Sequence, residues 1–578
     1  MEIFMYQKAL SFFTQLHSNR SELKYYGAHP MKAKMPMRTP VRDPFPRATP
    51  ESVGITSEYL QLFLKELNEM TELAPHLLMI AKDHKIILET EFYPYRLDTW
   101  HVSHSLCKTI TALAVGLMVE DGKLSLDEKI TDIFEKRAFS IDFVRQKDIT
   151  VRHLLNMSAG IAFNELGSVT YEDWVEGYFG SNLKFSPGSK FFYNSMNTYM
   201  LSAIIKEKTG RDMFDLLCER IFHPMGITEL YWEKSPKGLT KGGWGLYMKL
   251  EDTMKFGKLF LDGGRWNGTR LIGENWLKEM TAKQIDTPSS TSDYGYGYQI
   301  WRSVRPDSYQ MNGMLGQNLF IFPDIGMTIG IHSGSAEFFP KGRLQALVDK
   351  YFGGHYHPSA APLRPARRAC GALNAFSASL GLPPTQKRAE RMEKYSALMP
   401  LLDRSFEIDG KNASVLPITL SLIHANFPGN VEKLTFRAKG EQIELRLVGK
   451  DETITIPFAF DGTASYFDLS VNGERFAAAA IGKMTKNEDD VPVFKLSLHF
   501  METTAVRYIK IFFYRTKTVV RFSEEPSGAN LLEEFSPVLS DFLPDNKTVK
   551  TILAKTDNNN FYDLVDKLFT VQLTVKND

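Results

Sequence analysis

The sequence predicts an α/β protein of the α+β type, with an antiparallel sheet flanked by helices, an inserted helical lobe and a C-terminal all-β module. Three observations support this prediction. Strand-like runs occur near residues 76–92 and again near 318–332, the interval 105–277 has mostly helical periodicity, and residues 402–524 alternate between apolar and polar side chains. We therefore expect one sheet built from two distant arms of the chain, with the helical lobe between them.

The first arm of the predicted sheet follows an N-terminal extension, residues 1–45, that is rich in proline. The compact domain spans residues 46–356 and opens with a helix over Ser57–Glu72. A β-hairpin follows, with strands over His76–Lys82 and Lys85–Phe92 joined by a two-residue turn.

The second arm consists of strands over Asn318–Phe322 and Met327–His332, separated by a turn that contains proline and glycine. Beyond Tyr356 the composition changes to one rich in proline, alanine and arginine. This change predicts a linker over residues 357–401, in which there is room for a helix.

The C-terminal part of the chain has the alternation expected of a β-rich barrel or sandwich over residues 402–524. Residues 434–438 and 443–447 alternate on either side of a Lys-Gly turn and predict a hairpin, and Tyr508–Phe522 is predicted as one long strand. The remaining residues, 525–578, are polar and predict a helical tail.

The composition narrows the class of protein. The 578 residues carry 69 basic and 68 acidic side chains, a net charge of +1, which does not suggest nucleic acid or an anionic membrane as a partner. No apolar run approaches the ~20 residues of a membrane span. The first residues lack the features of a signal peptide, so we expect a cytoplasmic location. The three cysteines do not suit a disulfide framework or zinc, and we expect neither a metal nor a cofactor. The sequence does not predict the oligomeric state.

Ser105-Leu106-Cys107-Lys108 is the most informative motif in the chain. A serine and a lysine three residues apart on a helix lie on one face, so the amine can reach the hydroxyl and activate it for acyl transfer. The same spacing occurs at Ser21 and Ser181, but only Ser105 is followed by a long run of apolar residues at helical spacing. Ser105 is therefore the candidate nucleophile and Lys108 its partner.

Tyr193 is the candidate for a further proton carrier. It follows a Ser186-Pro187-Gly188 turn and precedes a helix predicted over Tyr199–Lys208, which places it at a helix entrance. The alternative is an ordinary core tyrosine, the expectation for most of the 23 tyrosines in the chain.

Together these motifs resemble those of the superfamily of class C β-lactamases, penicillin-binding proteins and serine esterases. The resemblance covers about residues 46–350 and rests on the Ser-x-x-Lys motif, the segment Ile149–Gly160, the Ser-Pro-Gly turn and Tyr193. It implies a β-lactamase-like fold, with Ser105 as the acylated nucleophile, Lys108 as its partner and Tyr193 as general base or proton carrier.

Two departures from the superfamily's pattern concern substrate binding. Ser195 stands where the second motif usually has asparagine, and Met311-Asn312-Gly313 stands where β-lactamases have Lys-Thr-Gly. The pattern is more similar to the branch of esterases and 6-aminohexanoate-oligomer hydrolases. By that resemblance the backbone N–H groups of Ser105 and Met314 form the oxyanion hole. The residues we expect to bind the oxyanion or substrate are Ser105, Met314, Gly313, Asn312, Ser195 and Gln317.

These observations leave three functions open. The first is a serine hydrolase of small esters or amides that acts through a Ser105 acyl-enzyme. The second is a β-lactamase or D-alanyl-D-alanine carboxypeptidase, which would take a β-lactam or peptide. The third is a non-catalytic binding protein that resembles penicillin-binding proteins. We expect His101, His104 and His332, which lie near the motifs, to be structural, and Cys107 to serve in packing.

Overall fold

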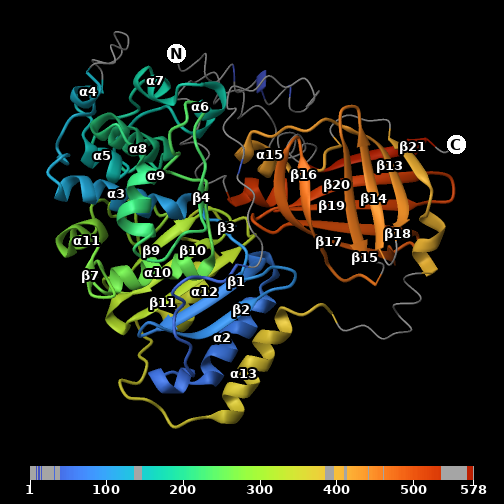
Figure 1. The fold of residues 1–578 in the computed structure, drawn as a ribbon, viewed down its shortest axis with the longest axis horizontal. Coiled ribbons are helices and arrows are strands. Elements are labelled where there is room, and N and C mark those ends of the chain that lie inside the picture. The colour runs from blue at the N-terminus through green and yellow to red at the C-terminus, as the bar shows by residue number, and fades with distance from the viewer. Residues whose placement is uncertain are drawn as a thin grey trace.

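The computed structural model describes residues 39–135, 146–384, 396–408, 413–439, 442–459, 461–534 and 569–576, together with Lys8, Ser11, Phe12, Gln15 and Lys32. In this part of the chain two bodies lie side by side: a mixed α/β domain and a β module formed by the C-terminal residues (Figure 1). Among the described residues, no helix combines the length and the apolar character needed to cross a bilayer.

The α/β domain is built on a six-stranded antiparallel sheet with the order β2-β1-β11-β10-β9-β8 in the described residues. As predicted, the first arm of the chain contributes β1 and β2, and the second arm contributes β10 and β11. The second arm also contributes β8 and β9. The strands are β1 (Pro75–Lys82), β2 (Lys85–Glu91), β8 (Trp301–Arg302), β9 (Tyr309–Gly313), β10 (Gln317–Phe322) and β11 (Met327–Ser333). The two arms meet where β1 pairs with β11, with Ile80 opposite Ile329.

The β1–β2 hairpin has the two-residue turn that the sequence predicts. Asp83 and His84 have φ values of 49° and 60°. Positive φ at both central residues is typical of a type I′ turn, whose twist matches that of the flanking strands.

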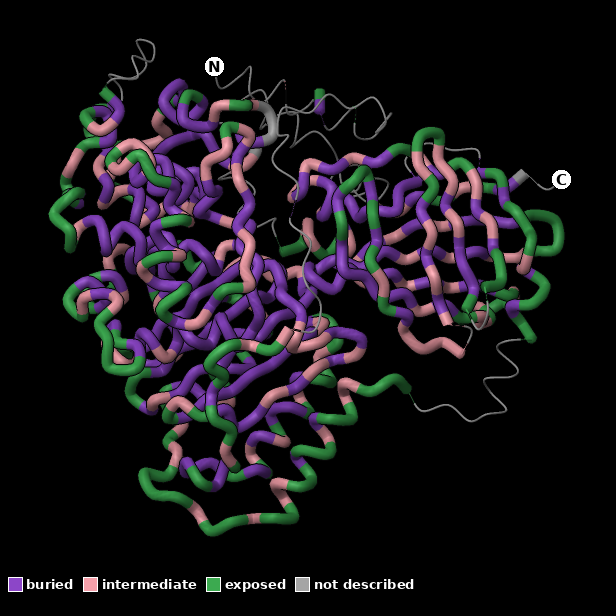
Figure 2. The backbone as a smooth tube through the Cα atoms, viewed as in Figure 1, coloured by how far each residue is buried: buried purple, intermediate pink, exposed green. Residues whose placement is uncertain are grey.

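The sheet is covered by helices on both faces because its strands bury both sets of alternating side chains. Met79 of β1 packs into the core shared with the helical lobe, whereas Leu78 and Ile80 pack into a second core on the opposite face. Figure 2 shows buried residues in the central sheet and in the helices on both of its faces. The opposite face is covered by α2 (Ser57–Glu69), α12 (Arg343–Phe352) and α13 (Arg367–Leu380).

The helical lobe occupies the chain between the two arms, as predicted. Its helices are α3 (Lys108–Glu120), α4 (Ile130–Ile133), α5 (Val151–Leu155), α6 (Glu165–Thr170), α7 (Trp174–Phe179), α8 (Ser195–Thr209), α9 (Met213–Leu217), α10 (Leu250–Leu261) and α11 (Glu274–Thr281). A small sheet joins β3 (His101–Val102), β5 (Leu246–Met248) and β4 (Tyr231–Trp232), and β6 (Arg265–Trp266) pairs with β7 (Thr269–Arg270).

The C-terminal module is a ten-stranded antiparallel near-barrel in the described residues, with the order β15-β14-β13-β12-β21-β20-β19-β18-β17-β16. The end strands β15 and β16 contact each other, so the sheet curls back on itself. Its elements are β12 (Ser405–Ile408), α15 (Ile418–His424), β13 (Val431–Lys439), β14 (Gln442–Gly449), β15 (Thr453–Ala459), β16 (Ser465–Val471), β17 (Glu474–Lys486), β18 (Pro492–Phe500), β19 (Val506–Phe513), β20 (Thr518–Glu525) and β21 (Val571–Lys576).

Two local predictions are corrected by the structure. Tyr508–Phe522 forms two strands, β19 and β20, because the chain turns near Tyr514–Lys517 without a glycine or proline to mark the turn. The predicted helical tail 525–578 ends in β21, which pairs with β20 and β12. The predicted linker 357–401 contains the helix for which the sequence left room. This helix is α13, which packs on the α/β domain, where the Ser377 hydroxyl donates to the Glu89 carbonyl of β2 at 2.7 Å.

Candidate active site

Ser105 lies on a short 3₁₀ turn, His104–Cys107, between strand β3 and helix α3. The turn is tied to the small sheet because the Ser103 hydroxyl and amide both donate to a carbonyl of β5, at 2.9 and 2.8 Å. His104 then takes a φ of 46°, which redirects the chain out of β3 and into the turn. The nucleophile therefore sits at the entrance of a buried helix, one turn earlier than the regular part of α3.

Lys108 is the centre of the site's hydrogen bonds. Its Nζ donates to Ser105 Oγ at 2.9 Å, to Ser195 Oγ at 2.9 Å and to the carbonyl of Gly243 at 2.6 Å. The side chain is 1% exposed, and all three acceptors are neutral. The structure thus brings together the serine and the lysine that the spacing predicts, and adds Ser195 from the second motif.

The burial of Lys108 changes its acidity. Loss of solvation lowers the pKa of its ammonium to about 8, while electrostatic interactions with Cys107 and Glu165 act in the opposite direction. A lysine with this pKa is partly neutral near physiological pH, and a neutral amine can accept the proton of Ser105.

Tyr193 is held beside this pair by its neighbour. Asn194 caps α8, accepting from the Met196 amide at 2.9 Å, and its Nδ2 donates to the carbonyl of Phe163 at 2.8 Å. The Tyr193 ring stacks on Trp301 with 5.6 Å between centroids. Burial raises the pKa of the Tyr193 phenol well above its ordinary value, and a hydrogen bond with the Ser105 side chain partly offsets that rise. The phenol therefore stays protonated at neutral pH.

Strand β9, which carries the third motif, packs directly against the nucleophile turn. A Cβ on Gly313 would lie 2.2 Å from the Ser103 carbonyl and 3.1 Å from the Leu106 nitrogen, so the close approach requires glycine. Met314 follows in the turn between β9 and β10. Met311 is fully buried and supplies no cation at the position of the Lys-Thr-Gly lysine.

Two of the predicted binding residues, Asn312 and Gln317, make hydrogen bonds to neighbouring strands and turns. Asn312 points to the other face of β9, where its Nδ2 donates to Asn318 Oδ1 at 2.8 Å. Gln317 is buried, and its amide donates to carbonyls of Leu315 and Ser333, at 2.7 Å each, while its Oε1 pairs with His332. Both side chains thus make hydrogen bonds around the β9–β10 hairpin, and their role in substrate binding stays a prediction.

Comparison with known proteins agrees with this geometry. Residues 64–349 match the beta-lactamase family. This segment of the chain belongs to the beta-lactamase family. This is a family of serine hydrolases, and the matched segment contains Ser105, Lys108 and Tyr193.

Relatives within the family have low identity and diverse activities. A 6-aminohexanoate-dimer hydrolase of Paenarthrobacter ureafaciens is 21% identical over 313 residues, 49% of this chain and 78% of that protein. A lovastatin esterase of Penicillium rubens is 27% identical over 175 residues, 26% of this chain and 43% of the esterase. A penicillin-binding protein homologue from Caulobacter crescentus, of solved structure, is 17% identical with a TM-score of 0.42, and covers 51% of this chain and 94% of its own.

Two contributors to this beta-lactamase-family site were not singled out from the sequence. Gly243 supplies the carbonyl that accepts from Lys108, and its neighbours Gly242 and Gly245 have positive φ. The Glu165 carboxylate accepts from the Ser195 amide at 2.9 Å. The sequence signal for Gly243 is the glycine-rich run Gly242-Gly243-Trp244-Gly245. The signal for Glu165 is its place as an acidic residue after the Ile149–Gly160 motif.

Three of the groups that we expect to be structural, Cys107, His101 and His332, make contacts within the protein. Cys107 is buried, donates to the Gly242 carbonyl at 3.3 Å, and has its pKa raised by burial to about 12. His101 stacks on His332 with 4.7 Å between ring centroids. His101 lies on β3 and His332 on β11 of the central sheet, so the stacked rings join the two sheets.

Proposed function

We propose that this chain hydrolyses small esters or amides through an acyl-enzyme on Ser105. The observation that supports this most is the position of the Lys108 amine, 2.9 Å from both Ser105 Oγ and Ser195 Oγ in a buried setting. A base in hydrogen-bond reach of a serine, oriented by further partners, is the arrangement that activates a serine nucleophile.

The proposed reaction moves one proton in a closed cycle. The neutral Lys108 amine takes the proton of Ser105 while Oγ forms a bond to the substrate carbonyl carbon. The N–H groups of Ser105 and Met314 stabilise the oxyanion. The proton then passes to the leaving alcohol or amine by way of the Tyr193 phenol as the carbon–oxygen or carbon–nitrogen bond breaks. Water repeats the steps in the second half, releases the acid and returns the proton.

The pH dependence of this mechanism has a definite sign. Lys108 must be neutral to accept a proton, and its pKa is lowered to about 8. The value of kcat/KM should therefore rise with pH, about tenfold per unit below that pKa, and level off above it. A profile that falls through this range would contradict Lys108 as the base.

Esters and amides are favoured over β-lactams by the third motif. Met311 is apolar and fully buried where β-lactamases carry a lysine, so a substrate carboxylate has no ammonium there. The names of two relatives, a 6-aminohexanoate-dimer hydrolase and a lovastatin esterase, support the same choice. Turnover of p-nitrophenyl butyrate should therefore exceed that of nitrocefin, and efficient nitrocefin cleavage would instead favour the β-lactamase alternative.

The nucleophile can be tested directly. A fluorophosphonate should phosphonylate wild-type protein on the peptide that contains Ser105, and the Ser105→Ala variant should not react. Labelling of a different serine would contradict the proposal. A complete absence of labelling and turnover in folded protein would favour a non-catalytic binding protein.

A further inference from the structure

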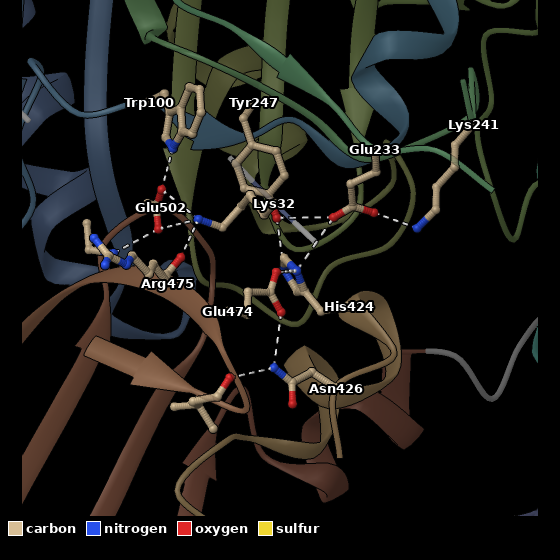
Figure 3. A network of polar contacts seen from close by, with 12 residues as sticks. Lys32, Trp100, Glu233, Lys241, Tyr247, His424, Asn426, Glu474, Arg475 and Glu502 are labelled. Carbon is tan, nitrogen blue, oxygen red and sulfur yellow. Dashed lines mark hydrogen bonds and ion pairs between the residues drawn. The ribbon is translucent and has the colours of Figure 1, made fainter. Parts of the chain in front are cut away.

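Six ionisable side chains lie buried between the α/β domain and the β module, and the proposed reaction uses none of them directly (Figure 3). They form three ion pairs whose side chains are each no more than 3% exposed. We call them the interface charge cluster: Lys32 with Glu502, Lys241 with Glu233, and His424 with Glu474.

His424 is the link between the two bodies. It ends helix α15 of the β module and pairs with Glu474 Oε1 of β17 at 2.9 Å through Nδ1. Its other nitrogen lies 2.9 Å from the hydroxyl of Tyr247, on β5 of the α/β domain. The same Nδ1 lies 3.7 Å from Glu233 Oε1, so one imidazole faces two carboxylates from different domains.

The charges of the cluster balance only when His424 is protonated. Three carboxylates face two lysines, and the imidazolium supplies the third positive charge. A buried unpaired charge is strongly unfavourable, so this balance is a physical requirement. Burial alone would lower the pKa of His424, but Glu474 and Glu233 outweigh it and raise that pKa, although Lys32 opposes them. His104 lies near enough for His424 to lower its pKa.

On the catalytic side the cluster continues into the carbonyl that holds Lys108. Glu233 Oε2 accepts from Lys241 Nζ at 2.5 Å, and the Lys241 amide donates to the Glu233 carbonyl at 3.0 Å. Two residues later, Gly243 donates to the Lys241 carbonyl at 2.7 Å and accepts from Lys108 at 2.6 Å. A Cβ on Gly243 would meet the Ser195 carbonyl at 2.9 Å, so this segment has little room to move.

The serine is tied to the same cluster by a second route. Glu502, after β18 of the β module, accepts from the Trp100 indole and from Lys32, and its carbonyl accepts from the Val102 amide of β3 at 2.8 Å. Strand β3 ends three residues before Ser105. Hydrogen bonds therefore connect residues of the β module to both Ser105 and Lys108: His424 lies on the route to Lys108, and Glu502 on the route to Ser105.

We propose that the β module is part of the catalytic unit, and that His424 is a positioning residue that keeps the Gly243 carbonyl on Lys108. This inference rests on the proposed function of Lys108 as the base. Without the positive charge of His424, Glu233 and Glu474 face each other across the interface, and the Lys241–Gly243 segment loses its anchor. The excess negative charge also favours the Lys108 ammonium, which makes Lys108 a poorer base at neutral pH.

The test compares His424→Gln with His499→Gln. His499 is a matched control because it lies on β18 at the same interface and contacts Tyr95 at 3.3 Å. Among the described residues, no hydrogen-bonded route leads from it through the cluster to Lys108. The decisive third variant is His424→Gln/Glu474→Gln, which removes one positive and one negative charge and restores the balance. Thermal melting of each variant reports on folding.

Two readouts separate this inference from the proposed function. The first is ester turnover against pH. The second is the pH dependence of Lys108 acetylation by acetic anhydride, measured by peptide mass spectrometry, which requires no hydrolysis. His424→Gln should lower kcat about tenfold at neutral pH with KM unchanged, which is within the effect of a small misplacement of a catalytic group. It should also move the titration of Lys108 upward by about half a pH unit or more.

The charge-balanced double variant should recover both readouts, and His499→Gln should leave both unchanged while it lowers the melting temperature. If wild-type protein shows no turnover, the proposed function fails, and the acetylation profiles still decide this inference. The inference is overturned if Lys108 titrates in His424→Gln as in wild type, or if restoring the charge balance recovers nothing. If His424→Gln does not fold, the double variant compared with His499→Gln decides: a wild-type Lys108 titration supports the inference and a shifted one overturns it.

Discussion

The active site and the domain interface each contain a fully buried lysine, and the two lysines differ in what faces them. Lys241, at the interface, is paired with the Glu233 carboxylate at 2.5 Å. Lys108, at the active site, donates to two hydroxyls and one carbonyl, all of them neutral. The same side chain is therefore held in two electrostatic settings within one domain.

The comparison shows that the effect of burial on a lysine ammonium depends on whether its partner is charged or neutral. A carboxylate partner compensates a buried ammonium and makes it a structural charge. Neutral partners leave the cost of burial uncompensated, which lowers the pKa of Lys108 to about 8 and makes its proton exchangeable. The chemistry of the site thus depends on what is absent beside Lys108 as much as on the hydroxyls that are present.

Lys108→Met should give the largest loss of activity. Removing a general base costs about 10²–10⁴ in rate, and the loss should appear in kcat/KM for p-nitrophenyl butyrate. Because no carboxylate among the described residues pairs with Lys108, its removal leaves no unpaired charge there, and the free energy of unfolding should change little, as measured by urea denaturation. An active Lys108→Met variant would end the assignment of Lys108 as base.

Lys241→Met should show the opposite pattern, with a large loss of stability and a smaller loss of activity than Lys108→Met. Removing one partner of a buried ion pair costs about 3–5 kcal/mol because the other charge stays buried. Adding Glu233→Gln should recover much of that stability, since it removes the unpaired carboxylate. Equal stability of the Lys241→Met and Lys108→Met variants would break the comparison.

Acidification should destabilise the interface through a second group of histidines. Burial lowers the pKa of His101 to about 4, of His104 to about 3 and of His499 to about 4. Below the ordinary value of 6.5 the unfolded chain binds protons that the folded chain does not, so stability falls as pH falls toward 4.

The expected cost of acidification to about pH 4 is about 3 kcal/mol for each fully buried ring, given about 1.4 kcal/mol per pKa unit. His499→Gln should reduce the acid sensitivity of thermal melting. His424 contributes with the opposite sign: its pKa is raised, so its contribution is present at low pH and is lost as pH rises through that raised value. Melting that is insensitive to pH between about 6.5 and 4 would contradict these assignments.

The proximity of the candidate catalytic residues could be predicted because their information is local. Ser105 and Lys108 are three residues apart, and Tyr193 is marked by a turn and a helix start on either side of it. The sheet could be predicted for a similar reason, since the periodicity of each strand lies within its own residues. The pairing of the two arms then follows from general rules of connection.

The rest of the site depends on contacts between distant residues. One of the three acceptors of Lys108 is the backbone carbonyl of Gly243, 135 residues away, and a backbone carbonyl cannot be recognised from the type of its side chain. The hydrogen bonds of Asn312 and Gln317 could not be predicted, because they depend on the register of β9 against β10, which the motif does not contain. The support from Glu502 comes from a different domain and was equally invisible.

Ser195→Ala should have the smallest effect and should sharpen the comparison most. Ser195 Oγ is one of the three neutral acceptors of Lys108, at 2.9 Å, and its loss removes a hydrogen bond worth about 0.5–1.5 kcal/mol. That bond favours the charged amine, so the titration of Lys108 should move to lower pH in Ser195→Ala, opposite to the shift expected for His424→Gln. The expected result is a few-fold loss of kcat and a rising limb of the kcat/KM profile that moves to lower pH. This result would show that the neutral partners and the distant charges affect the pKa of Lys108 independently. If both variants shifted the limb in the same direction, a general loosening of the site would explain them better than the two separate electrostatic causes.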